Sequence, residues 1–382
     1  MTAMLYTTPP SLGIRLPRLG FGCMRLPLTD PGAPASINME EFQQMVDYAM
    51  DNGVNYFDTA YMYHGGQSER ALGQVLRRYP RESYILVDKM PLGEIHCEAD
   101  LDRVFREQLA RCGVDYFDFY FIHGVNHREK DEKIKKFDVY GFLQRMHEEG
   151  RIRFLGFSFH DTPAFFGEFV NRYRWDLAQV ELNYFDWDLQ QGRELYEEIE
   201  KKGIPVTVME PVRGGLLAQL PEDIAAPLAA AAPGRTQASF ALRWIAQFPQ
   251  VAVVLSGMSN MQQLRENIET FSVNEPLSEA ESAAVDAVRD RLRERYEIPC
   301  TRCRYCMECP SGTDIPEQFW RYNRFRLVGG KEDYLAWYEK AAENGKGIDR
   351  CVQCGACLPK CPQNIDIPAR LRYVREQAEA LR

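Results

Sequence analysis

Eight of the eleven cysteines lie in two short runs near the end of the chain. The first run is CTRCRYCMECP at 300–310, and the second is CVQCGACLPKCP at 351–362. Thiolates are strong ligands for soft metal ions, and closely spaced cysteines can share one metal centre. In a reducing compartment this spacing indicates metal binding before disulfide formation. The last part of the chain is therefore predicted to bind metal.

The second run has the spacing C-x₂-C-x₂-C-x₃-C-P, which matches the pattern of bacterial ferredoxins that hold [4Fe-4S] clusters. The first run is a variant, because two residues rather than three precede its last cysteine. In the ferredoxin pattern the fourth cysteine of each run binds the other cluster. Two clusters are therefore predicted. The expected ligand sets are Cys300, Cys303, Cys306 and Cys361 for one cluster, and Cys351, Cys354, Cys357 and Cys309 for the other.

Zinc is the alternative occupant, with two Cys₄ sites holding a small domain together. Zinc modules usually pair two C-x₂-C knuckles across a loop, whereas each run here continues through further cysteines to Cys-Pro. This difference favours iron–sulfur clusters. The stretch between the runs is predicted to be helical, and DIP recurs after each run at 314–316 and 366–368. The segment 296–382 resembles the α-helical dicluster ferredoxins.

Ionisable side chains follow several apolar runs earlier in the chain. Asp58, Lys89 and His123 each close such a run, and Tyr63 follows Asp58 by five residues. Alone, an Asp can cap a helix and a His can be structural. Together these side chains could reduce a carbonyl. Tyr63 would donate the proton, with its pKa lowered by Lys89. Asp58 would keep Lys89 charged, and His123 would orient the carbonyl oxygen.

Short β-rich runs alternate with amphipathic helical stretches between residue 19 and about residue 290. This alternation predicts a parallel sheet covered by helices. Eight strand–helix units predict an α/β fold of the (β/α)₈ TIM barrel type, in which catalytic groups lie at the carboxyl ends of the strands. A doubly wound open sheet is the alternative, but its G-x-G-x-x-G fingerprint is missing. The expected strands are 19–23, 53–58, 83–89, 116–123, 152–158, 177–183, 204–210 and 251–257.

Three further stretches complete the predicted organisation. The charged stretch 127–136 is expected to be a solvated loop, and 222–235 a helix with a loop. The last barrel helix is predicted at 278–295, after which the composition shifts to cysteine and aromatic residues. We therefore predict a barrel domain at 1–295 and a small α-helical ferredoxin-type domain at 296–382.

The composition is that of an ordinary globular protein, with 45% hydrophobic and 26% charged residues. A net charge of −9 provides no basic surface for nucleic acid. The first residues contain no apolar leader region, and nowhere do eighteen apolar residues follow one another. We expect a cytoplasmic protein that binds neither nucleic acid nor membrane.

The motifs NYFDTAYMY, DKMP, DFYFIHG and LGFSFH resemble those of the aldo-keto reductase superfamily over roughly residues 12–290. This resemblance implies a catalytic tetrad of Asp58, Tyr63, Lys89 and His123, with Tyr63 as the general acid. It also implies that Ser158, Gln179 and Asn183 contact the nicotinamide of NAD(P)H. The remaining cofactor contacts, toward the phosphates, are expected from Arg213, Gly214, Gly215, Ser256, Gly257, Gln263 and Asn267.

The phosphate region departs from the family pattern. The places of the Lys and Arg that clasp the 2′-phosphate of NADPH hold Gly257 and Gln263 here. Arg213 and Arg265 are the nearby candidates to replace them. NADH, or a different cofactor, is therefore the alternative to NADPH. Glu210, at the end of the seventh strand, needs a partner if it is buried, and Arg213 is also the candidate for this role.

The two predicted parts handle electrons differently. Nicotinamide transfers two electrons as a hydride, whereas a cluster passes one, so flavin is a candidate intermediary. The main hypothesis is an iron–sulfur oxidoreductase that reduces a small carbonyl or oxidises an alcohol, and whose clusters exchange electrons with a ferredoxin-like partner. One alternative is an ordinary NAD(P)H-dependent carbonyl reductase with structural or redox-sensing clusters. The other is a non-catalytic subunit of an electron-transfer complex, which the intact tetrad disfavours.

Overall fold

The computed structural model describes residues 4–127, 129–300, 302, 304–307, 309–361 and 363–382, and these form two compact units. The first unit comprises Met1–Asn183, Gln191–Val212 and Ala238–Ser278. The second comprises Tyr184–Gln190, Arg213–Gln237 and Glu279–Arg382. The second unit thus combines the C-terminal segment with two loops that follow barrel strands. The predicted domain boundary after residue 295 stays a prediction, because each of the two units is made of several segments of the sequence.

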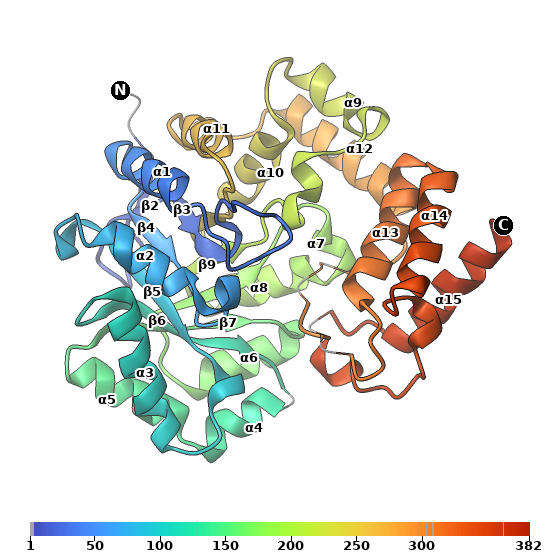
Figure 1. Cartoon of the computed structure of the whole chain (residues 1–382). Coiled ribbons are helices and arrows are strands. Elements are labelled where there is room, and N and C mark those ends of the chain that lie inside the picture. The colour runs from blue at the N-terminus through green and yellow to red at the C-terminus, as the bar shows by residue number, and fades with distance from the viewer. Residues whose placement is uncertain (1–3, 128, 301, 303, 308, 362) are drawn as a thin grey trace. The chain divides into compact units, whose positions relative to one another are not determined.

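The first unit is built on a closed ring of eight parallel strands (Figure 1). The order around the ring is β10-β3-β4-β5-β6-β7-β8-β9, so neighbours in sequence are neighbours in space. The strands are β3 (Leu19–Gly22), β4 (Tyr56–Asp58), β5 (Ile85–Met90), β6 (Phe117–Val125), β7 (Ile152–Phe159), β8 (Leu177–Glu181), β9 (Val206–Met209) and β10 (Val251–Ser256). All eight predicted strands, and the TIM barrel, are confirmed. A short hairpin of β1 (Tyr6–Thr7) and β2 (Leu16–Pro17) was not predicted.

The strands are held together by large apolar side chains inside the ring. Tyr56, Phe119 and Phe121 are fully buried there and belong to one apolar cluster. Gly156 on β7 allows this packing, because a Cβ atom at this position would lie 2.4 Å from the Phe121 ring. The interior is a packed core, which leaves the strand ends as the place for polar chemistry.

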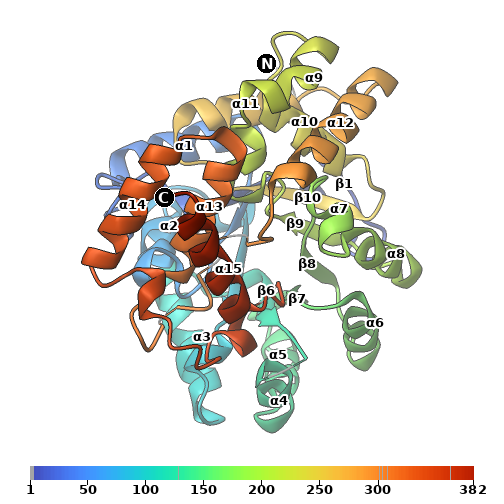
Figure 2. The same cartoon turned by 90° about the vertical axis from the view of Figure 1, so that its right-hand side faces the viewer.

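Helices of the first unit lie outside the ring (Figures 1 and 2). They are α1 (Met39–Asp51), α2 (Ser68–Leu76), α3 (Ala99–Cys112), α4 (Glu129–Lys136), α5 (Val139–Glu148), α6 (Pro163–Arg172), α8 (Gly192–Lys202), α10 (Gln237–Ala246) and α11 (Met261–Phe271). Local sequence explains their ends. Asn38 caps α1 by accepting from the Glu41 backbone N–H, and α3 stops at Gly113, whose φ of 67° is left-handed.

Helix α4 corrects our expectation of a solvated loop at 127–136. The stretch is helical because its charges are partnered and one apolar side chain is buried. Asp131 accepts from Lys135 one turn later, at 2.8 Å, and also pairs with Arg172. Ile134 is 1% exposed. Composition alone showed a charged stretch and could not reveal these tertiary partners.

The second unit is helical in its described residues. Its helices are α7 (Asp186–Leu189), α9 (Glu222–Ala231), α12 (Glu279–Arg295), α13 (Ile315–Val328), α14 (Lys331–Glu343) and α15 (Ile367–Ala380). The helices predicted in 222–235 and 278–295 are confirmed. Helices α13, α14 and α15 pack together (Figure 2) around Phe319, Tyr322, Tyr334, Leu371 and Val374.

The repeated DIP motif begins two of these helices. Asp314 precedes α13 and Asp366 precedes α15, with a proline in the first turn of each helix. Asp366 accepts a hydrogen bond from the Ala369 backbone N–H at 3.1 Å. Asp314 makes no such bond among the described residues, so the two helix starts share the motif but only the second is capped by its aspartate side chain.

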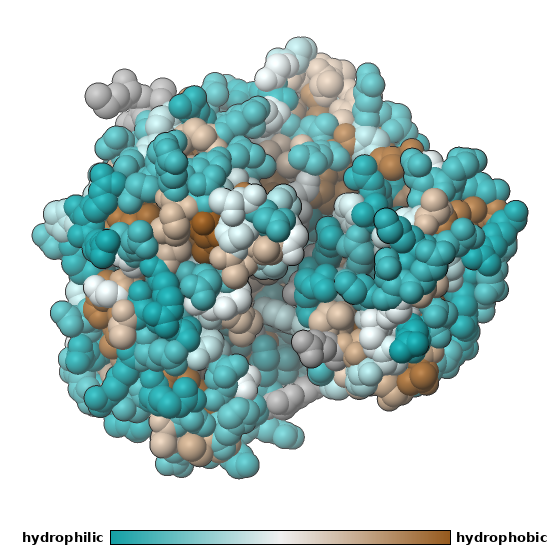
Figure 3. Space-filling view, in the orientation of Figure 1, coloured by the Kyte–Doolittle hydropathy of each residue, from teal (hydrophilic) through white to brown (hydrophobic). Residues whose placement is uncertain are grey.

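The face of the molecule drawn in Figure 3 is largely polar. Hydrophilic side chains cover most of this face, with apolar side chains scattered between them. Among the described residues, no helix has the length and apolar character needed to cross a membrane.

Candidate active site

The four side chains predicted to act together lie at the same end of neighbouring strands. Asp58 is the last residue of β4, Lys89 is near the end of β5, and His123 is in the last part of β6. Tyr63 follows in the short helix Tyr63–Gly66. Lys89 Nζ donates to Asp58 Oδ1 at 2.6 Å and to the Thr59 carbonyl at 2.8 Å. The structure thus brings the predicted tetrad together around a fully buried ammonium group.

Gln179 completes the surroundings of Asp58. Its side-chain Nε2 donates to Asp58 Oδ2 at 2.8 Å, across the ring from β8. Both carboxylate oxygens are therefore hydrogen-bonded, as a buried carboxylate requires. Gln179 was predicted to contact a cofactor, and this bond gives it a second role that strand position alone did not indicate.

The ionisation of Tyr63 differs from our expectation. We expected Lys89 to lower the pKa of the phenol, and Lys89 Nζ does lie 5.1 Å from the centre of the Tyr63 ring. Burial, however, raises the pKa of Tyr63 well above 10, and the negative charge of Asp58 raises it further. Tyr63 is therefore protonated at neutral pH, which is the form that a proton donor needs.

His123 is the neutral partner of Tyr63. Their ring centroids lie 6.2 Å apart with an edge-on orientation. Burial lowers the pKa of His123 well below 6.5, and the positive charges of Lys89 and Lys130 lower it further. Its Nδ1 atom is buried without a hydrogen-bond partner among the described residues. A buried polar atom of this kind is satisfied when a substrate oxygen or a water molecule occupies the site.

The backbone around Tyr63 is held by its neighbour His64, which sequence reasoning missed. His64 has a positive φ of 54°. Its Nε2 accepts from the Leu26 backbone N–H at 3.0 Å, and its Nδ1 donates to the Pro34 carbonyl at 2.7 Å. These bonds tie the loop carrying Tyr63 to the loop after β3. The only sequence signal was the position of a histidine directly after the catalytic tyrosine.

Lys130 and His160 were also missed near the site. Lys130 Nζ donates to the His123 carbonyl at 3.5 Å. Burial lowers the pKa of His160 to about 3, with a further contribution from Lys130, so the imidazole is neutral. His160 ends the motif LGFSFH, which was the available signal. Lys130 was hidden in the stretch that we expected to be a loop.

The predicted nicotinamide contacts lie on the adjoining strands. Ser158 on β7 and Gln179 on β8 are register partners, and Asn183 follows the end of β8. Ser158 Oγ accepts from the Gly124 backbone N–H at 2.7 Å, and Asn183 Nδ2 donates to the Glu210 carbonyl at 3.2 Å. A hydroxyl and two amides supply both donors and acceptors, which suits a carboxamide ring substituent. These residues therefore fit a nicotinamide.

The predicted phosphate region of the first unit lies where β10 passes into α11. Asn267 Nδ2 donates to Ser256 Oγ at 2.9 Å. Asn260 caps α11 and accepts from the Gln263 backbone N–H at 3.0 Å. A Cβ atom on Gly257 would lie 3.3 Å from the side chain of Arg25. Arg25 is therefore the cation beside Gly257, and sequence reasoning missed it.

The two arginines proposed as replacement cations have other contacts. The Arg265 guanidinium lies 5.3 Å from the centre of the Tyr48 ring. Arg213 belongs to the second unit and bonds to Asp186. Arg213 was also our candidate partner for Glu210, which is wrong, because Glu210 pairs with Arg25 at 3.6 Å. Spacing in sequence could not distinguish these partners.

Gly214 and Gly215 also fall in the second unit, directly after Arg213. Their φ angles are 62° and 95°, so this loop uses the left-handed region that glycine adopts at low cost. Their predicted cofactor contact stays a prediction.

Cysteines from both runs line one cavity of the second unit. The cavity is lined by Cys309, Cys351, Cys354 and Cys357, the complete predicted set for one cluster. Cys306, which we assigned to the other cluster, lines the same cavity. Thiols are the donor type that an iron–sulfur cluster requires, and among the described residues no three potential ligands are yet gathered as around a metal ion.

The other predicted set is described only in part. Burial raises the pKa of the Cys300 thiol, and Cys361 is close enough to raise it further. Cys300 and Cys361 come from different runs, and their assignment to one cluster stays a prediction. Cys303 lies outside the described residues.

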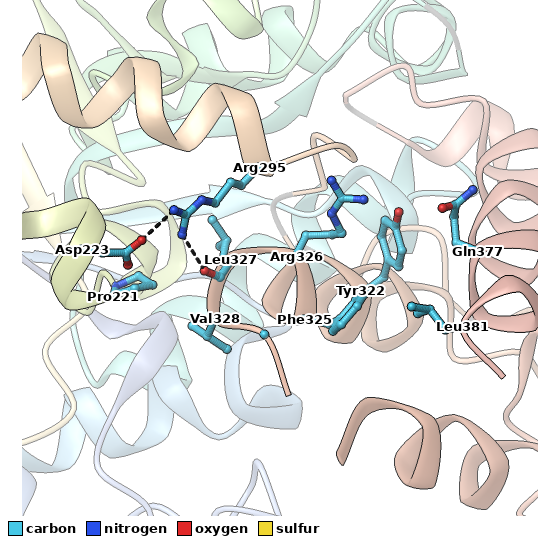
Figure 4. A pocket seen from close by; sticks show the side chains of 11 residues that line it. Pro221, Asp223, Arg295, Tyr322, Phe325, Arg326, Leu327, Val328, Gln377 and Leu381 are labelled. Carbon is cyan, nitrogen blue, oxygen red and sulfur yellow. Dashed lines mark hydrogen bonds and ion pairs between the residues drawn. The ribbon is translucent and has the colours of Figure 1, made fainter. Parts of the chain in front are cut away.

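A separate cavity of about 640 Å³ lies within the second unit (Figure 4). Arg295 at its edge pairs with Asp223 at 2.6 Å and donates to the Leu327 carbonyl at 3.2 Å. Tyr322 and Phe325 form part of its apolar wall. None of the predicted site residues lines this cavity, so it is distinct from the tetrad and from the cysteines.

Comparisons with known proteins agree with this geometry. Residues 18–290 match the family model described as the aldo/keto reductase family, and residues 299–365 match a 4Fe-4S dicluster domain. An uncharacterized oxidoreductase of Bacillus subtilis is 26% identical over 299 residues, covering 70% of this chain and 91% of the relative. The NADH-specific methylglyoxal reductase of Escherichia coli is 25% identical over 325 residues, covering 73% and 96%. The holo form of an aldo-keto reductase from Bacillus halodurans superposes with a TM-score of 0.60 at 25% identity, covering 75% and 96%.

The bond between Gln179 and Asp58 predicts a stability effect. Replacing Gln179→Leu removes a donor from a buried carboxylate, so we expect the free energy of unfolding to fall by about 2 kcal/mol. Urea titration followed by circular dichroism measures this change. The matched control is Gln262→Leu, because Gln262 bonds to the Glu266 carboxylate at 2.8 Å on the exposed face of α11. Equal effects of the two substitutions would contradict a special role for the buried bond.

Proposed function

The chain belongs to the aldo/keto reductase family, and we propose that it is an iron–sulfur oxidoreductase that uses Tyr63 to protonate a carbonyl, or in reverse to deprotonate an alcohol. The observation that carries this proposal is the buried Lys89–Asp58 pair beside a protonated Tyr63 and a neutral His123. These groups have the protonation states that carbonyl reduction requires at neutral pH.

Tyr63 is the proposed proton donor. Its phenol is protonated because burial disfavours the phenolate. When the proton passes to the carbonyl oxygen, a negative charge develops on the tyrosine oxygen. The Lys89 ammonium, 5.1 Å from the ring centre, stabilises that charge. Asp58 holds the ammonium group in place, and Gln179 holds Asp58. Little reorganisation of these groups therefore accompanies the proton transfer.

His123 orients the substrate in this proposal. Its neutral imidazole can donate one hydrogen bond to the carbonyl oxygen without competing for the proton of Tyr63. The pKa of His123 is far below 6.5 because the ring is buried beside positive charges. His64 keeps the Tyr63 loop at the mouth through its two backbone hydrogen bonds.

The cofactors are assigned to the residues that fit them. Ser158, Gln179 and Asn183 would hold the nicotinamide ring, and Arg25 would face the phosphate end of the nucleotide. The cysteines would hold two [4Fe-4S] clusters, with one ligand of each set taken from the other run. When bound, the nicotinamide would supply a hydride and the clusters would supply single electrons, so a flavin would connect the two kinds of transfer, and a ferredoxin-like partner would exchange single electrons with the clusters.

A structural role for the clusters is the second candidate. Cys306 and Cys361 are buried within the apolar core of the second unit, alongside Phe319 and Leu371. Metal binding at such positions contributes to folding as well as to any redox chemistry. Under this alternative the barrel would reduce carbonyls with a nicotinamide cofactor alone.

Loss of the proton donor is the first test. Tyr63→Phe removes the hydroxyl that protonates the carbonyl, so we expect carbonyl reduction to fall roughly 100- to 10,000-fold with iron content unchanged. Methylglyoxal with NADH is the first probe, since the relative from Escherichia coli is named for that reaction.

Between about pH 7 and pH 9 we expect no change from Tyr63 or His123 in the rate of the chemical step, because the raised and lowered pKa values keep both groups neutral.

Tyr61→Phe is the matched control. Tyr61 lies two residues from Tyr63, and its hydroxyl donates to Glu107 at 3.1 Å outside the tetrad. It should retain activity. Tyr63 is not the proton donor if Tyr63→Phe keeps full activity. The same conclusion follows if the native rate shows an ionisation between pH 7 and pH 9 that the Tyr63→Phe variant lacks.

Cofactor preference is the second test. With Gly257 and Gln263 in place of two cations, we expect NADH to bind at least as tightly as NADPH in calorimetric titrations. The double variant Gly257→Lys with Gln263→Arg should strengthen NADPH binding by about 10-fold or more, because the new cations can pair with the 2′-phosphate. Arg265→Gln is the control and should change neither affinity. A strong NADPH preference in the native chain would contradict this account.

Iron content is the third test. Anaerobically prepared chain should carry about eight irons, two clusters of four. Cys309→Ser removes a ligand from the set with Cys351, Cys354 and Cys357, so we expect one cluster to be lost or altered while the other keeps its spectrum. Cys97→Ser changes an exposed cysteine two residues before α3 and should leave iron content intact. Stoichiometric zinc, or equal loss in both variants, would refute the assignment.

A further inference from the structure

Glu210 is an acidic residue that the proposed carbonyl chemistry does not use. It directly follows β9, which ends at Met209, so it lies at the same end of the ring as the tetrad. Its backbone φ is 55°, in the left-handed region that residues other than glycine rarely adopt. Pro211 comes next, and a residue before proline ordinarily has an extended backbone. Strain of this kind persists only where the surroundings impose it, and it is concentrated at functional sites.

The carboxylate of Glu210 is incompletely paired. Its Oε2 atom is buried without a hydrogen-bond partner among the described residues. Its Oε1 atom faces Arg25 Nη2 at 3.6 Å, which is an ion pair but is too long for a hydrogen bond. Leaving a buried carboxylate oxygen without a donor costs free energy. A ligand with an N–H or O–H group beside Oε2 would remove this cost.

Two neighbours fix the place of Glu210 along the proposed nucleotide site. Its carbonyl accepts a hydrogen bond from Asn183 Nδ2 at 3.2 Å, and Asn183 is a proposed nicotinamide contact. Its carboxylate pairs with Arg25, which we assigned to the phosphate end. Arg25 is held there, because Ser259 Oγ donates to its carbonyl at 2.8 Å and its side chain would lie 3.3 Å from a Cβ atom on Gly257. Glu210 therefore connects the nicotinamide end of the site with the phosphate end.

A nicotinamide nucleotide carries a ribose between these two ends. The ribose has two neighbouring hydroxyl groups, and each can donate a hydrogen bond. Acidic side chains accept from ribose hydroxyl groups in other nucleotide-binding folds. An ionised acceptor makes such a bond stronger than a neutral one does. The buried Oε2 atom of Glu210 therefore has both the chemistry and the place to meet this ribose.

We propose that Glu210 binds the ribose attached to the nicotinamide, by accepting a hydrogen bond from a ribose hydroxyl group at Oε2. Arg25 balances the carboxylate charge, so the acid can lie near the diphosphate without strong repulsion. This inference rests on the nicotinamide assignment of the proposed function. It adds a contact to the sugar, and it gives a reason for a strained and incompletely paired acid at the end of β9.

The test is a calorimetric titration of the full-length, cluster-loaded chain with two ligands. One is NADH, and the other is an NADH analogue whose nicotinamide sugar lacks both hydroxyl groups. The native chain should bind NADH about 10-fold or more tightly than the analogue, because the analogue leaves the carboxylate unpaired. Glu210→Gly should bind the two ligands within about 2-fold of each other, and comparing two ligands cancels any general effect of the lost charge. Glu210→Gln should retain part of the preference, since its amide oxygen is a neutral acceptor.

Glu210→Gly also separates binding from folding. Glycine adopts a φ of this sign at low cost, so the variant should keep its iron and its melting temperature. If it does not fold, Glu210→Gln decides: a reduced preference for NADH supports the inference, and an unchanged preference overturns it. Glu269→Ala is the matched control, because Glu269 is an exposed acid on α11 of the same unit. It should keep the native preference.

The inference is wrong if the native chain binds NADH and the analogue equally, or if folded Glu210→Gly keeps the full preference. It is also wrong if Glu210→Gly loses selectivity for hydroxyacetone over acetone while its preference for NADH is unchanged, because Glu210 would then bind a substrate hydroxyl group. A native chain that does not bind NADH at all would refute the nicotinamide assignment itself, and this inference with it.

Discussion

The candidate active site depends on one buried ion pair. Lys89 is fully buried, and an ammonium group in that position is stable only if its charge and its N–H groups are matched. Asp58 and the Thr59 carbonyl provide this match, and Gln179 bonds to the second oxygen of Asp58. The pair requires that β4, β5 and β8 end at the same level, which the closed parallel ring ensures. The ordered charge beside Tyr63 is thus a consequence of the barrel itself, and the protonated tyrosine and neutral histidine follow from the same burial.

The barrel and the position of the tetrad could be predicted from the sequence because both follow from repeated local patterns. Eight apolar runs predicted eight strands, and a polar residue at the end of a run predicted a side chain at the mouth. Side-chain partners could not be predicted in this way. The bond from Gln179 to Asp58 spans the ring, and the pairing of Arg25 with Glu210 joins loops far apart in sequence. The raised pKa of Tyr63 was missed for the same reason, because it depends on burial.

In the cysteine segment, too, the spacing of residues predicted some features, and others depend on packing that the sequence does not show. Spacing predicted that the ligands of each cluster would come from both runs, and one cavity is lined by Cys306 and Cys309 of the first run with three cysteines of the second. It did not predict that the loops after β8 and β9 would join the second unit, since this depends on the contacts of Arg213, Asp186 and Tyr296. Two loops that begin at barrel strands are therefore part of the surroundings of Cys300.

The central claim is that the tetrad and the clusters serve one reaction. It is tested most directly by reducing the clusters anaerobically with dithionite, removing the excess reductant, and adding a flavin, NAD⁺ and methylglyoxal, because the flavin converts single electrons into the pair that NAD⁺ accepts. The account predicts that the signal of the reduced clusters decays, that one alcohol forms for every two electrons lost, and that Tyr63→Phe prevents alcohol formation. A signal that persists in the native chain, while NADH alone supports carbonyl reduction, would contradict the claim and leave the clusters with a structural role.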